Sequence, residues 1–343
     1  MSGAGAATTT IGEATALAAR LLGRTGVPEH HADRTAELLV LADVWGIGSH
    51  GLMRLPYYLS RLTAGGLDPR AELDVVRENG SVLAYHGNDG LGHWQLWRAA
   101  EAATDRAREH GLAVASVASS SHCGCLGLYA LPAVRAGLVA LVFSTGPAVM
   151  APPGTATPLL STSPLAAGIP SRPRPAIVDL ATSAVARGKI AAHARRGEPL
   201  GEGWAVDAGG EPTTDARAAL AGMLAPLGGG KGFALAFLVE ALAAGLAGPD
   251  LATDVVDMFD RRHDAVPQRI GHLVLTLDPG AIAADGRAQE RLDELARQVG
   301  RAGGRIPGAA RQMPWELDEA APVEIDRTVL DQLLSWEAAS HAS

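Results

Sequence analysis

Residues 81–120, SVLAYHGNDGLGHWQLWRAAEAATDRAREHGLAVASVASS, contain the pattern that decides the fold class. The runs SVLAYHG and LAVASVAS are strand-like, and the segment between them has the apolar spacing of a helix that ends at Gly111. A strand, a helix and a second strand in this order indicate an α/β protein. The glycines of GNDGLG do not have the G-x-G-x-x-G spacing of a Rossmann turn. The stretch therefore favours an α/β fold other than the Rossmann fold.

The same alternation continues through the middle of the chain, between two helical ends. Further strand-like runs cover residues 73–79, 138–145, 176–182 and 269–278, and helical runs cover residues 186–197 and 226–248. Two helices are expected within residues 9–43, a third from Leu52 to Ala64, and two more within residues 286–301 and 326–339. The expected organisation is a helical segment over residues 1–75, a central α/β region over 76–280, and a C-terminal helical segment over 281–343 that returns to the first.

Composition and charge narrow the class of protein. The chain has 343 residues, a net charge of −8 and a pI near 5.8, so it offers no basic surface for nucleic acid. Cys123 and Cys125 are too few for a disulfide framework, which suits a reducing compartment. The N-terminus has no basic leader, and the apolar run Gly232–Gly248 contains Glu240 and is short for a membrane span, so we expect a buried helix there. We expect a cytoplasmic protein with neither a membrane nor a nucleic-acid partner.

The stretch WGIGSHGLMRLPYYLSRL, residues 45–62, carries the first candidate chemistry. His50, Arg54 and Tyr58 are spaced at i, i+4 and i+8, so the expected helix would place all three on one face. Histidine suits proton transfer near neutral pH, and arginine binds a carboxylate through two parallel hydrogen bonds. The alternative is that His50 is a core histidine beside a glycine turn.

Two further motifs raise the question of a bound ligand. In PLGGGKGF, residues 226–233, three glycines precede Lys231 at a helix start, where backbone N–H groups can bind an anion, although the motif does not match a P-loop. The alternative is a solvated lysine on a flexible helix end. In His122-Cys123-Gly124-Cys125, the histidine follows a strand end, where α/β proteins bind ligands. A structural zinc site needs four ligands and no second cluster appears, so no metal is expected.

Taken together and in order, six motifs resemble those of the malate/L-lactate dehydrogenase family: GIGSHGLMRLPYYLSRLTAGGL, GNDGLGHW, SSSHCG, STSPLAAGIP, VDLATSAVARGKIAAHARRGEPLGEGWAVDAGGEPTTD and PLGGGKGFALAFLVE. The resemblance covers residues 10 to 310. It implies a mixed α/β fold that is not Rossmann, and NAD(P)-dependent reduction of a small 2-oxo acid. A cyclic 2-imino acid such as piperideine- or pyrroline-2-carboxylate is the alternative substrate, and a non-catalytic cofactor-binding relative is a third possibility.

The resemblance also implies site residues and a homodimer. His50 is the expected proton donor, with His122 as second candidate or substrate contact, and Ser49, Arg54 and Tyr58 are expected to bind the substrate. NAD(H) or NADP(H) is expected at Val178, Asp179, Leu180, Ala181, Thr182, Lys231, Gly232, Pro307 and Gly308. Residues 1–75 would then be the substrate side and 76–280 the dinucleotide-binding region. Apolar residues of the Trp94–Trp97 helix and of residues 232–248 are the expected dimer surface.

Four departures from the family's usual motifs lie near the expected site. The chain has Ser144-Thr145-Gly146, Ser161-Thr162-Ser163-Pro164, Pro307-Gly308-Ala309 and Cys123 where the family usually has Thr-Asn-Ser, Gly-Thr-Asn-Pro, Pro-Gly-Glu and Phe. Because His50, Arg54, His122 and Lys231 are all present, the departures favour an unusual substrate over loss of activity.

Overall fold

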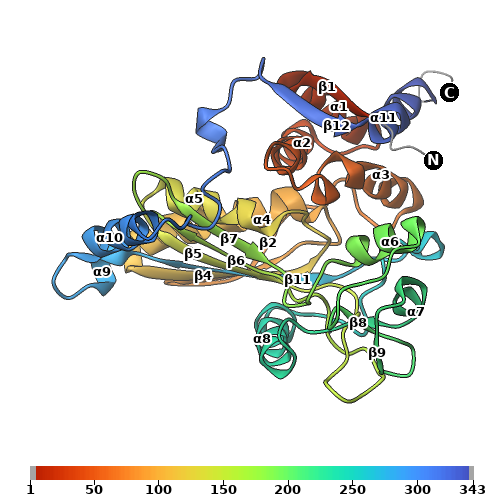
Figure 1. Cartoon of the computed structure of the whole chain (residues 1–343). Coiled ribbons are helices and arrows are strands. Elements are labelled where there is room, and N and C mark those ends of the chain that lie inside the picture. Colours follow the sequence, from red (N-terminus) through yellow and green to blue (C-terminus); the bar gives the residue numbers. More distant parts are fainter. Residues whose placement is uncertain (1–4, 340–343) are drawn as a thin grey trace.

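A helical layer forms one end of the molecule. The computed structural model describes residues 5–339, and in it this layer lies above a large sheet (Figure 1). The layer consists of α1 (Ile11–Arg24), α2 (Glu29–Val44), α3 (Leu55–Ala64) and the C-terminal α11 (Arg327–Ala339). Thr10 and Glu13 form a capping box that starts α1, and Gly65, with φ of +90°, ends α3. The helices bury an apolar cluster that includes Leu17, Leu39 and Leu59.

The two ends of the chain are joined within this layer. Strand β1 (Ala6–Thr10) pairs antiparallel with β12 (Pro322–Asp326), with Ala7 opposite Ile325. The sequence analysis did not anticipate either strand, because each has five residues and the pairing spans almost the whole chain. Helix α11 follows β12 and buries Val329 and Leu333 in the same apolar cluster as α1 and α3.

The large sheet has seven strands in the order β2-β3-β4-β11-β5-β6-β7. Their bounds are β2 (Asp74–Asn79), β3 (Val82–His86), β4 (Leu112–Ser120), β5 (Val139–Ser144), β6 (Leu165–Ile169), β7 (Ala176–Leu180) and β11 (Ile270–Leu277). Among the described pairs, β3 and β4 run parallel across α4 (Gly92–His110), and the other neighbours are antiparallel. A Rossmann sheet is parallel, so the predicted mixed α/β, non-Rossmann fold is confirmed.

Small side chains allow α4 to lie close to the sheet. Ala99, Ala103 and Ala107 of the helix are fully buried in one cluster with Ala115 and Val117 of β4. The short helix α5 (Leu131–Arg135) joins the same cluster. This packing fixes the end of β4, after which His122 follows.

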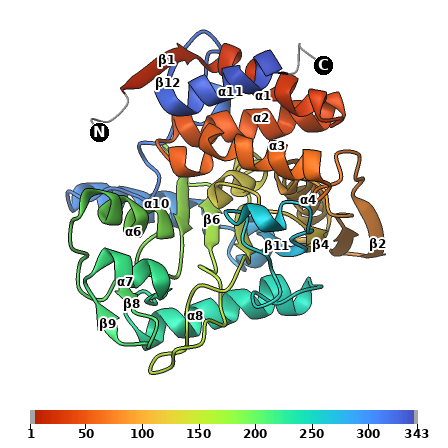
Figure 2. The same ribbon diagram turned by 90° about the vertical axis from the view of Figure 1, so that its right-hand side faces the viewer.

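A smaller layer lies at one end of the strands of the large sheet, and most of it is farther from the helical layer than the sheet is (Figure 1 and Figure 2). It contains α6 (Arg187–Arg196), α7 (Ala216–Ala221) and a small sheet of β8 (Ala205–Val206), β9 (Pro212–Thr213) and β10 (Met223–Leu224). Strands of two residues carry no alternating pattern, which is why the sequence did not predict them. Their core includes Met150, Leu160 and Ile190.

The apolar run Gly232–Gly248 is not the buried helix that the sequence predicted. Helix α8 (Gly230–Glu240) continues as a π-helical segment (Ala241–Leu246), and Phe237 and Leu246 are 62% and 73% exposed. The helix lies on the molecular surface and buries one stripe that contains Ala236, Val239 and Glu240. No helix within residues 5–339 has the length and apolar character needed to cross a bilayer.

The continuous helix predicted from Leu52 to Ala64 is also wrong at its start. Two 3-10 turns, Gly48–His50 and Leu52–Arg54, precede α3, which begins at Leu55 with Pro56 in its first turn. Gly51 separates the turns with ψ of −144°, which a helix does not allow. His50, Arg54 and Tyr58 therefore do not share one face of a single helix, although they remain neighbours. Elsewhere, α9 (Pro279–Ile282) and α10 (Ala288–Arg301) project from the large sheet.

A buried histidine in the helical layer predicts how stability depends on pH. His31 is 4% exposed and stacks on Trp94 with ring centroids 3.5 Å apart, and burial, helped by His30, lowers its pKa to about 4. Between the unfolded pKa near 6.5 and about 4, the unfolded chain binds a proton that the folded chain does not, so stability falls as pH falls. Replacement His31→Gln removes this contribution, and the loss of unfolding free energy from pH 7 to 4 should shrink by about 1 to 3 kcal/mol.

Urea unfolding at several pH values measures the effect. His110→Gln, at an exposed histidine, should keep the wild-type pH dependence. Equal pH dependence in His31→Gln and wild type would show that His31 is protonated alike in both states.

Candidate active site

The turn that carries His50 is built around a buried carboxylate. Asp43, near the end of α2, accepts a hydrogen bond from the Leu52 N–H at 2.8 Å. A Cβ at Gly51 would lie 2.3 Å from an Asp43 oxygen, so that glycine is required for the carboxylate to sit under the turn. Burial raises the pKa of Asp43 to about 7. The glycine of the Ser-His-Gly motif is thus explained by its packing against Asp43.

His50 is a neutral imidazole at neutral pH. Burial, together with the positive charge of Arg54, lowers its pKa to about 4, and Asp179 opposes the shift. Its Nδ1 lies 2.9 Å from the hydroxyl of Ser49, which is exposed. The ring lies 5.9 Å from that of His122, with the two planes inclined by 25°. The structure therefore brings together the two histidines that the sequence singled out.

His122 is held with its hydrogen on Nε2. The Gly124 N–H donates to His122 Nδ1 at 3.3 Å, and the Tyr58 hydroxyl lies 2.6 Å from the same atom. An amide N–H can only donate, so Nδ1 carries no hydrogen and the Tyr58 hydroxyl must also donate to it. Burial, followed by the charges of His50 and Arg54, lowers the pKa of His122 well below its usual value, so the ring is neutral. These partners assign the Nε2–H tautomer.

Tyr58 lies behind His122 rather than on an open surface. The side chain is 1% exposed, and burial raises its pKa, so it remains a phenol whose hydroxyl bonds to His122. Its ring meets that of His93 edge-on at 5.0 Å. This geometry supports a role for Tyr58 in positioning His122 more than the predicted role in substrate binding.

Arg54 presents an unsatisfied donor close to both histidines. Its Nε is buried and has no hydrogen-bond partner within residues 5–339, and burial lowers the pKa of the guanidinium. The ring of Phe259 covers one face of the guanidinium at 4.5 Å. A buried guanidinium with an unused donor is suited to bind a carboxylate.

The segment 250–266 forms a wall of the site, and the sequence analysis missed it. Phe259 packs edge-on against Tyr57 at 5.2 Å, and the fully buried Arg61 donates hydrogen bonds to the carbonyls of His263 and Val266. One signal for Arg61 was present, because it follows Tyr58 by three residues and so shares its helix face. Nothing in the local pattern of DVVDMFD marks Phe259.

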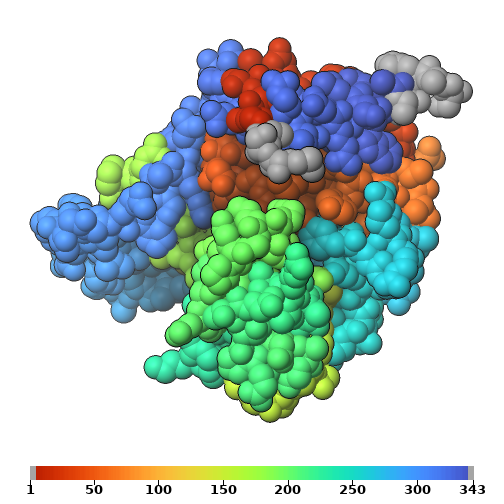
Figure 3. All heavy atoms as spheres, turned by 45° about the vertical axis from the view of Figure 1, so that its right-hand side comes forward, coloured from red at the N-terminus to blue at the C-terminus, as the bar shows by residue number. Residues whose placement is uncertain are grey.

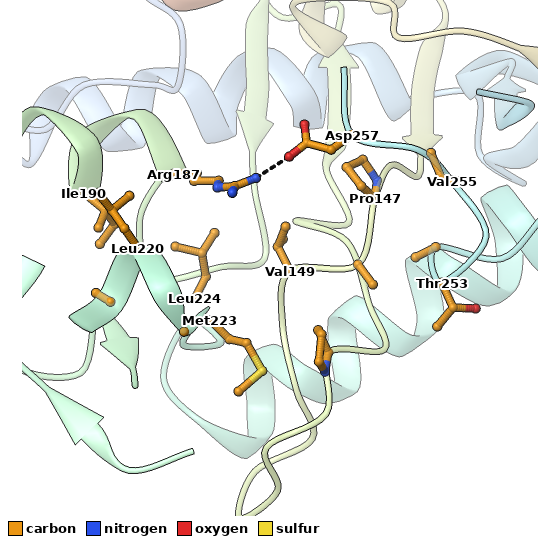
Figure 4. Close-up of a pocket in the computed structure, with 15 residues that line it drawn as sticks. Pro147, Val149, Arg187, Ile190, Leu220, Met223, Leu224, Thr253, Val255 and Asp257 are labelled. Carbon is orange, nitrogen blue, oxygen red and sulfur yellow. Dashed lines mark hydrogen bonds and ion pairs between the residues drawn. The ribbon is translucent and has the colours of Figure 1, made fainter. Parts of the chain in front are cut away.

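A cavity of about 400 Å³ lies between this wall and the small layer. Figure 4 shows Ile190, Leu220, Met223 and Leu224 on one side and Pro147, Val255 and Thr253 on the other. An ion pair between Arg187 and Asp257 crosses it. A second, more open cavity of about 590 Å³ shares both residues and extends to Phe259. In Figure 3 the α6–α7 segment and the 250–266 segment lie below the helical layer.

Most of the predicted cofactor residues meet at one edge of the large sheet. Val178, Asp179 and Leu180 belong to the edge strand β7, and the carbonyl of Pro307 accepts the N–H of Ile177 in that strand at 3.0 Å. Asp179 accepts the N–H of Gly127 at 2.9 Å and contacts the Cys125 thiol at 3.1 Å.

The start of α8 lies beside the same edge. The Leu227 N–H donates to the carbonyl of Thr182 at 2.8 Å, and Gly232 packs against Leu227 so closely that no larger residue would fit. Gly229 caps α8 without a side-chain hydrogen bond, and the exposed Lys231 lies in the first turn. Unpaired N–H groups at a helix start, with a lysine, suit a phosphate or a ribose hydroxyl. The residues present therefore fit a dinucleotide.

The two thiols are poor metal ligands in this setting. Both cysteines are buried and free, and burial raises the pKa of Cys123 to about 12 and that of Cys125 well above its usual value. Metals bind the thiolate, which these surroundings disfavour. Within the described part of the chain, no group of three or more histidine, cysteine or acidic residues is arranged to hold a metal ion.

Comparison with known proteins gives consistent matches over nearly the whole chain. A model of the malate/L-lactate dehydrogenase family matches residues 9–334. The (2R)-3-sulfolactate dehydrogenase (NADP(+)) of Chromohalobacter salexigens is 37% identical over 94% of this chain and 96% of its own length. The Delta(1)-pyrroline-2-carboxylate reductase of Pseudomonas fluorescens is 36% identical over 95% and 97%. The structure of sulfolactate dehydrogenase from Methanocaldococcus jannaschii superposes with a TM-score of 0.89 at 28% identity, covering 98% of both chains.

The hydrogen bond from Tyr58 to His122 predicts a measurable tautomer. Nitrogen-15 NMR of the histidine rings should show His122 with a protonated Nε2 and a bare Nδ1. In Tyr58→Phe the stronger of the two donors to Nδ1 is lost, so the shifts of the two nitrogens should move toward each other as both tautomers are populated. Tyr57→Phe, whose ring faces Phe259, is the control and should leave His122 unchanged. Identical His122 shifts in Tyr58→Phe and wild type would contradict the assignment.

Proposed function

Because the chain belongs to the malate/L-lactate dehydrogenase family, we propose that it reduces a small 2-oxo acid to the 2-hydroxy acid, or catalyses the reverse reaction, with NAD(H) or NADP(H). The predictions of this family, of its mixed α/β fold, of a dehydrogenase or reductase and of an NAD(P) cofactor are confirmed by the comparisons. The observation that carries the proposal is the cluster of two neutral imidazoles beside a guanidinium with an unused buried donor. The cofactor supplies the hydride when it is bound.

Arg54 is the proposed anchor for the substrate carboxylate. The Nε of Arg54 lacks a hydrogen-bond partner, and the ring of Phe259 covers one face of the guanidinium. A carboxylate in the plane of the guanidinium would therefore satisfy the unused donor. That anion would also offset the positive charge that lowers the pKa of both His50 and His122. Substrate binding would therefore make it easier for an adjacent imidazole to take up a proton.

The hydrogen bonds of the two histidines support different roles for them. Nδ1 of His122 already receives two donors, so this ring is proposed to remain neutral and to donate its Nε2–H to the carbonyl oxygen of the substrate. His50 contacts the exposed Ser49 hydroxyl through Nδ1, which connects it to solvent protons. His50 is thus the proposed proton donor, and Ser49 its route for reprotonation.

The residues proposed to hold the cofactor are those at the edge of the large sheet. The backbone of Val178–Thr182 and the loop at Pro307-Gly308 would contact the dinucleotide, and the start of α8 with Lys231 and Gly232 would hold a phosphate or ribose hydroxyl. Support comes from the uncapped α8 terminus beside Thr182. The departure at Gly146 would remove a side-chain contact to the hydroxyl of either the cofactor or the substrate.

A cyclic 2-imino acid is the second candidate substrate. Relatives named for sulfolactate and for pyrroline-2-carboxylate are 37% and 36% identical to this chain, so identity does not separate them. Both substrates carry a carboxylate for Arg54, and His50 would protonate nitrogen instead of oxygen. Initial rates with a panel of 2-oxo and cyclic 2-imino acids, each tested with NADH and NADPH, decide between them. Absence of turnover with every pair, despite cofactor binding, would favour a non-catalytic relative.

Replacement His50→Asn tests the proposed acid. The change removes the titrating group but keeps a similar size, so kcat should fall about 100- to 10,000-fold. The matched change His110→Asn, at an exposed histidine far along α4, should leave kcat unaltered. Turnover close to wild type in His50→Asn would remove His50 from the mechanism and leave His122 as the donor.

We propose that the exposed face of α8 contacts a second copy of the chain in a homodimer. Phe237, Leu238 and Leu246 are all more than half exposed on this surface, and large exposed apolar groups on one helix are typical of an interface. Symmetric homodimers are the commonest assembly of soluble proteins. Trp94, which the sequence analysis placed at the dimer surface, is instead buried against His31 and takes no part.

Light scattering of the purified protein should therefore report two 35.2 kDa chains. Phe237→Glu places a charge in the proposed interface and should shift the mass to that of one chain, because burying an unpaired carboxylate is costly. Leu334→Glu, at an exposed leucine of α11, is the matched control and should stay dimeric. A wild-type monomer at micromolar concentration would contradict the proposal.

A further inference from the structure

The ion pair across the cavity joins two parts of the chain that are far apart in sequence. Arg187 is the first residue of α6, and Asp257 lies in the wall segment 250–266, with Arg187 Nη1 2.5 Å from Asp257 Oδ2. Among the described residues that line the 400 Å³ cavity, these two are the charged ones, and the others are mostly apolar (Figure 4). The cavity therefore offers one cation and one anion in otherwise apolar surroundings.

Asp257 also connects this cavity to the proposed substrate anchor. Its Oδ1 accepts the N–H of Phe259 at 3.0 Å, and the ring of Phe259 lies 4.5 Å from the guanidinium of Arg54. The negative charge of Asp257 is close enough to raise the pKa of Arg54 against the effect of burial. The Asp257 carboxylate thus pairs with the guanidinium of Arg187 and also acts electrostatically on that of Arg54.

The guanidinium of Arg187 is only partly used. One of its N–H groups bonds to Asp257, and the described residues supply no hydrogen-bond partner to the others. The side chains of Arg187 and Asp257 are 46% and 25% exposed, and an ion pair so open to water contributes little to stability. An incoming anion can therefore compete for Arg187. The next cation of α6, Lys189, lies over the ring of Trp204 at 4.2 Å and outside this cavity.

We propose that Arg187 determines substrate specificity by binding a second acidic group, a carboxylate or sulfonate at the far end of a 2-oxo acid held at Arg54. The inference rests on the proposed function. A two-point contact from a planar guanidinium suits either group, because both present two oxygens in the required geometry. Asp257 competes with the second acidic group for Arg187, and its negative charge repels that group.

The test is the ratio of kcat/KM for a substrate with two acidic groups to kcat/KM for pyruvate. Oxaloacetate and 3-sulfopyruvate are the two probes, and they separate a carboxylate from a sulfonate preference. In wild type the ratio should exceed one for at least one probe. In Arg187→Gln the ratio should fall about tenfold to a hundredfold, as expected for losing a hydrogen bond to a charged group. In Asp257→Asn, which removes the competing charge, the ratio should rise.

Two controls separate a role of Arg187 in substrate specificity from other effects of its substitution. Lys189→Gln, the matched loss of a cation on the same helix, should keep the wild-type ratio. Cofactor binding, followed by fluorescence, should be equal in Arg187→Gln and wild type. Weaker cofactor binding in this variant, with an unchanged ratio of kcat/KM values, would show that Arg187 contacts the cofactor and would overturn the inference. A wild type that prefers pyruvate would overturn it too. Failure of wild type to reduce any of these acids would instead overturn the proposed function.

Discussion

The site depends on placing two imidazoles and a guanidinium in a space from which water is mostly excluded. Each positive charge there makes the next one harder to form, which is why His50 and His122 are neutral beside Arg54. Neutral imidazoles can be held close only if their hydrogen bonds are fixed by neighbours. Asp43 under the turn of His50 and Tyr58 behind His122 supply that support, so the helical layer and the end of β4 must pack correctly for the site to exist.

The parts of the fold that the sequence predicted are those with local patterns. The strand-helix-strand stretch 81–120 predicted β3, α4 and β4, and the glycine spacing excluded a Rossmann turn. The pairing of β1 with β12 and the two-residue strands β8, β9 and β10 depend on contacts between distant segments, which no local pattern shows. The predicted helix over Leu52–Ala64 started too early because apolar spacing does not reveal the carboxylate of Asp43 under Gly51.

The residues of the candidate site also fall into those that a local pattern predicts and those that depend on contacts between distant segments. Ser49, His50, Arg54 and His122 stand in short motifs whose chemistry can be recognised from the residue types alone. The wall formed by Phe259, and the ion pair of Asp257 with Arg187, arise where segments about 70 to 200 residues apart meet. Tyr58 was found by its spacing from His50, but its part in holding His122 required the position of its hydroxyl. Residue types thus indicated the reaction, whereas the discrimination among acids proposed for the site depends on tertiary contacts.

The antiparallel pairing of β1 with β12 has a consequence for biosynthesis. The helical layer that carries His50 and Arg54 buries Val323, Ile325, Val329 and Leu333, which are synthesised long after α1 and α3. Until β12 and α11 have been synthesised, α1 and α3 expose the apolar surface that these residues later cover. A nascent or prematurely terminated chain would lack this cover and would present that surface to chaperones and proteases. The pairing therefore couples assembly of the site to the synthesis of β12 and α11.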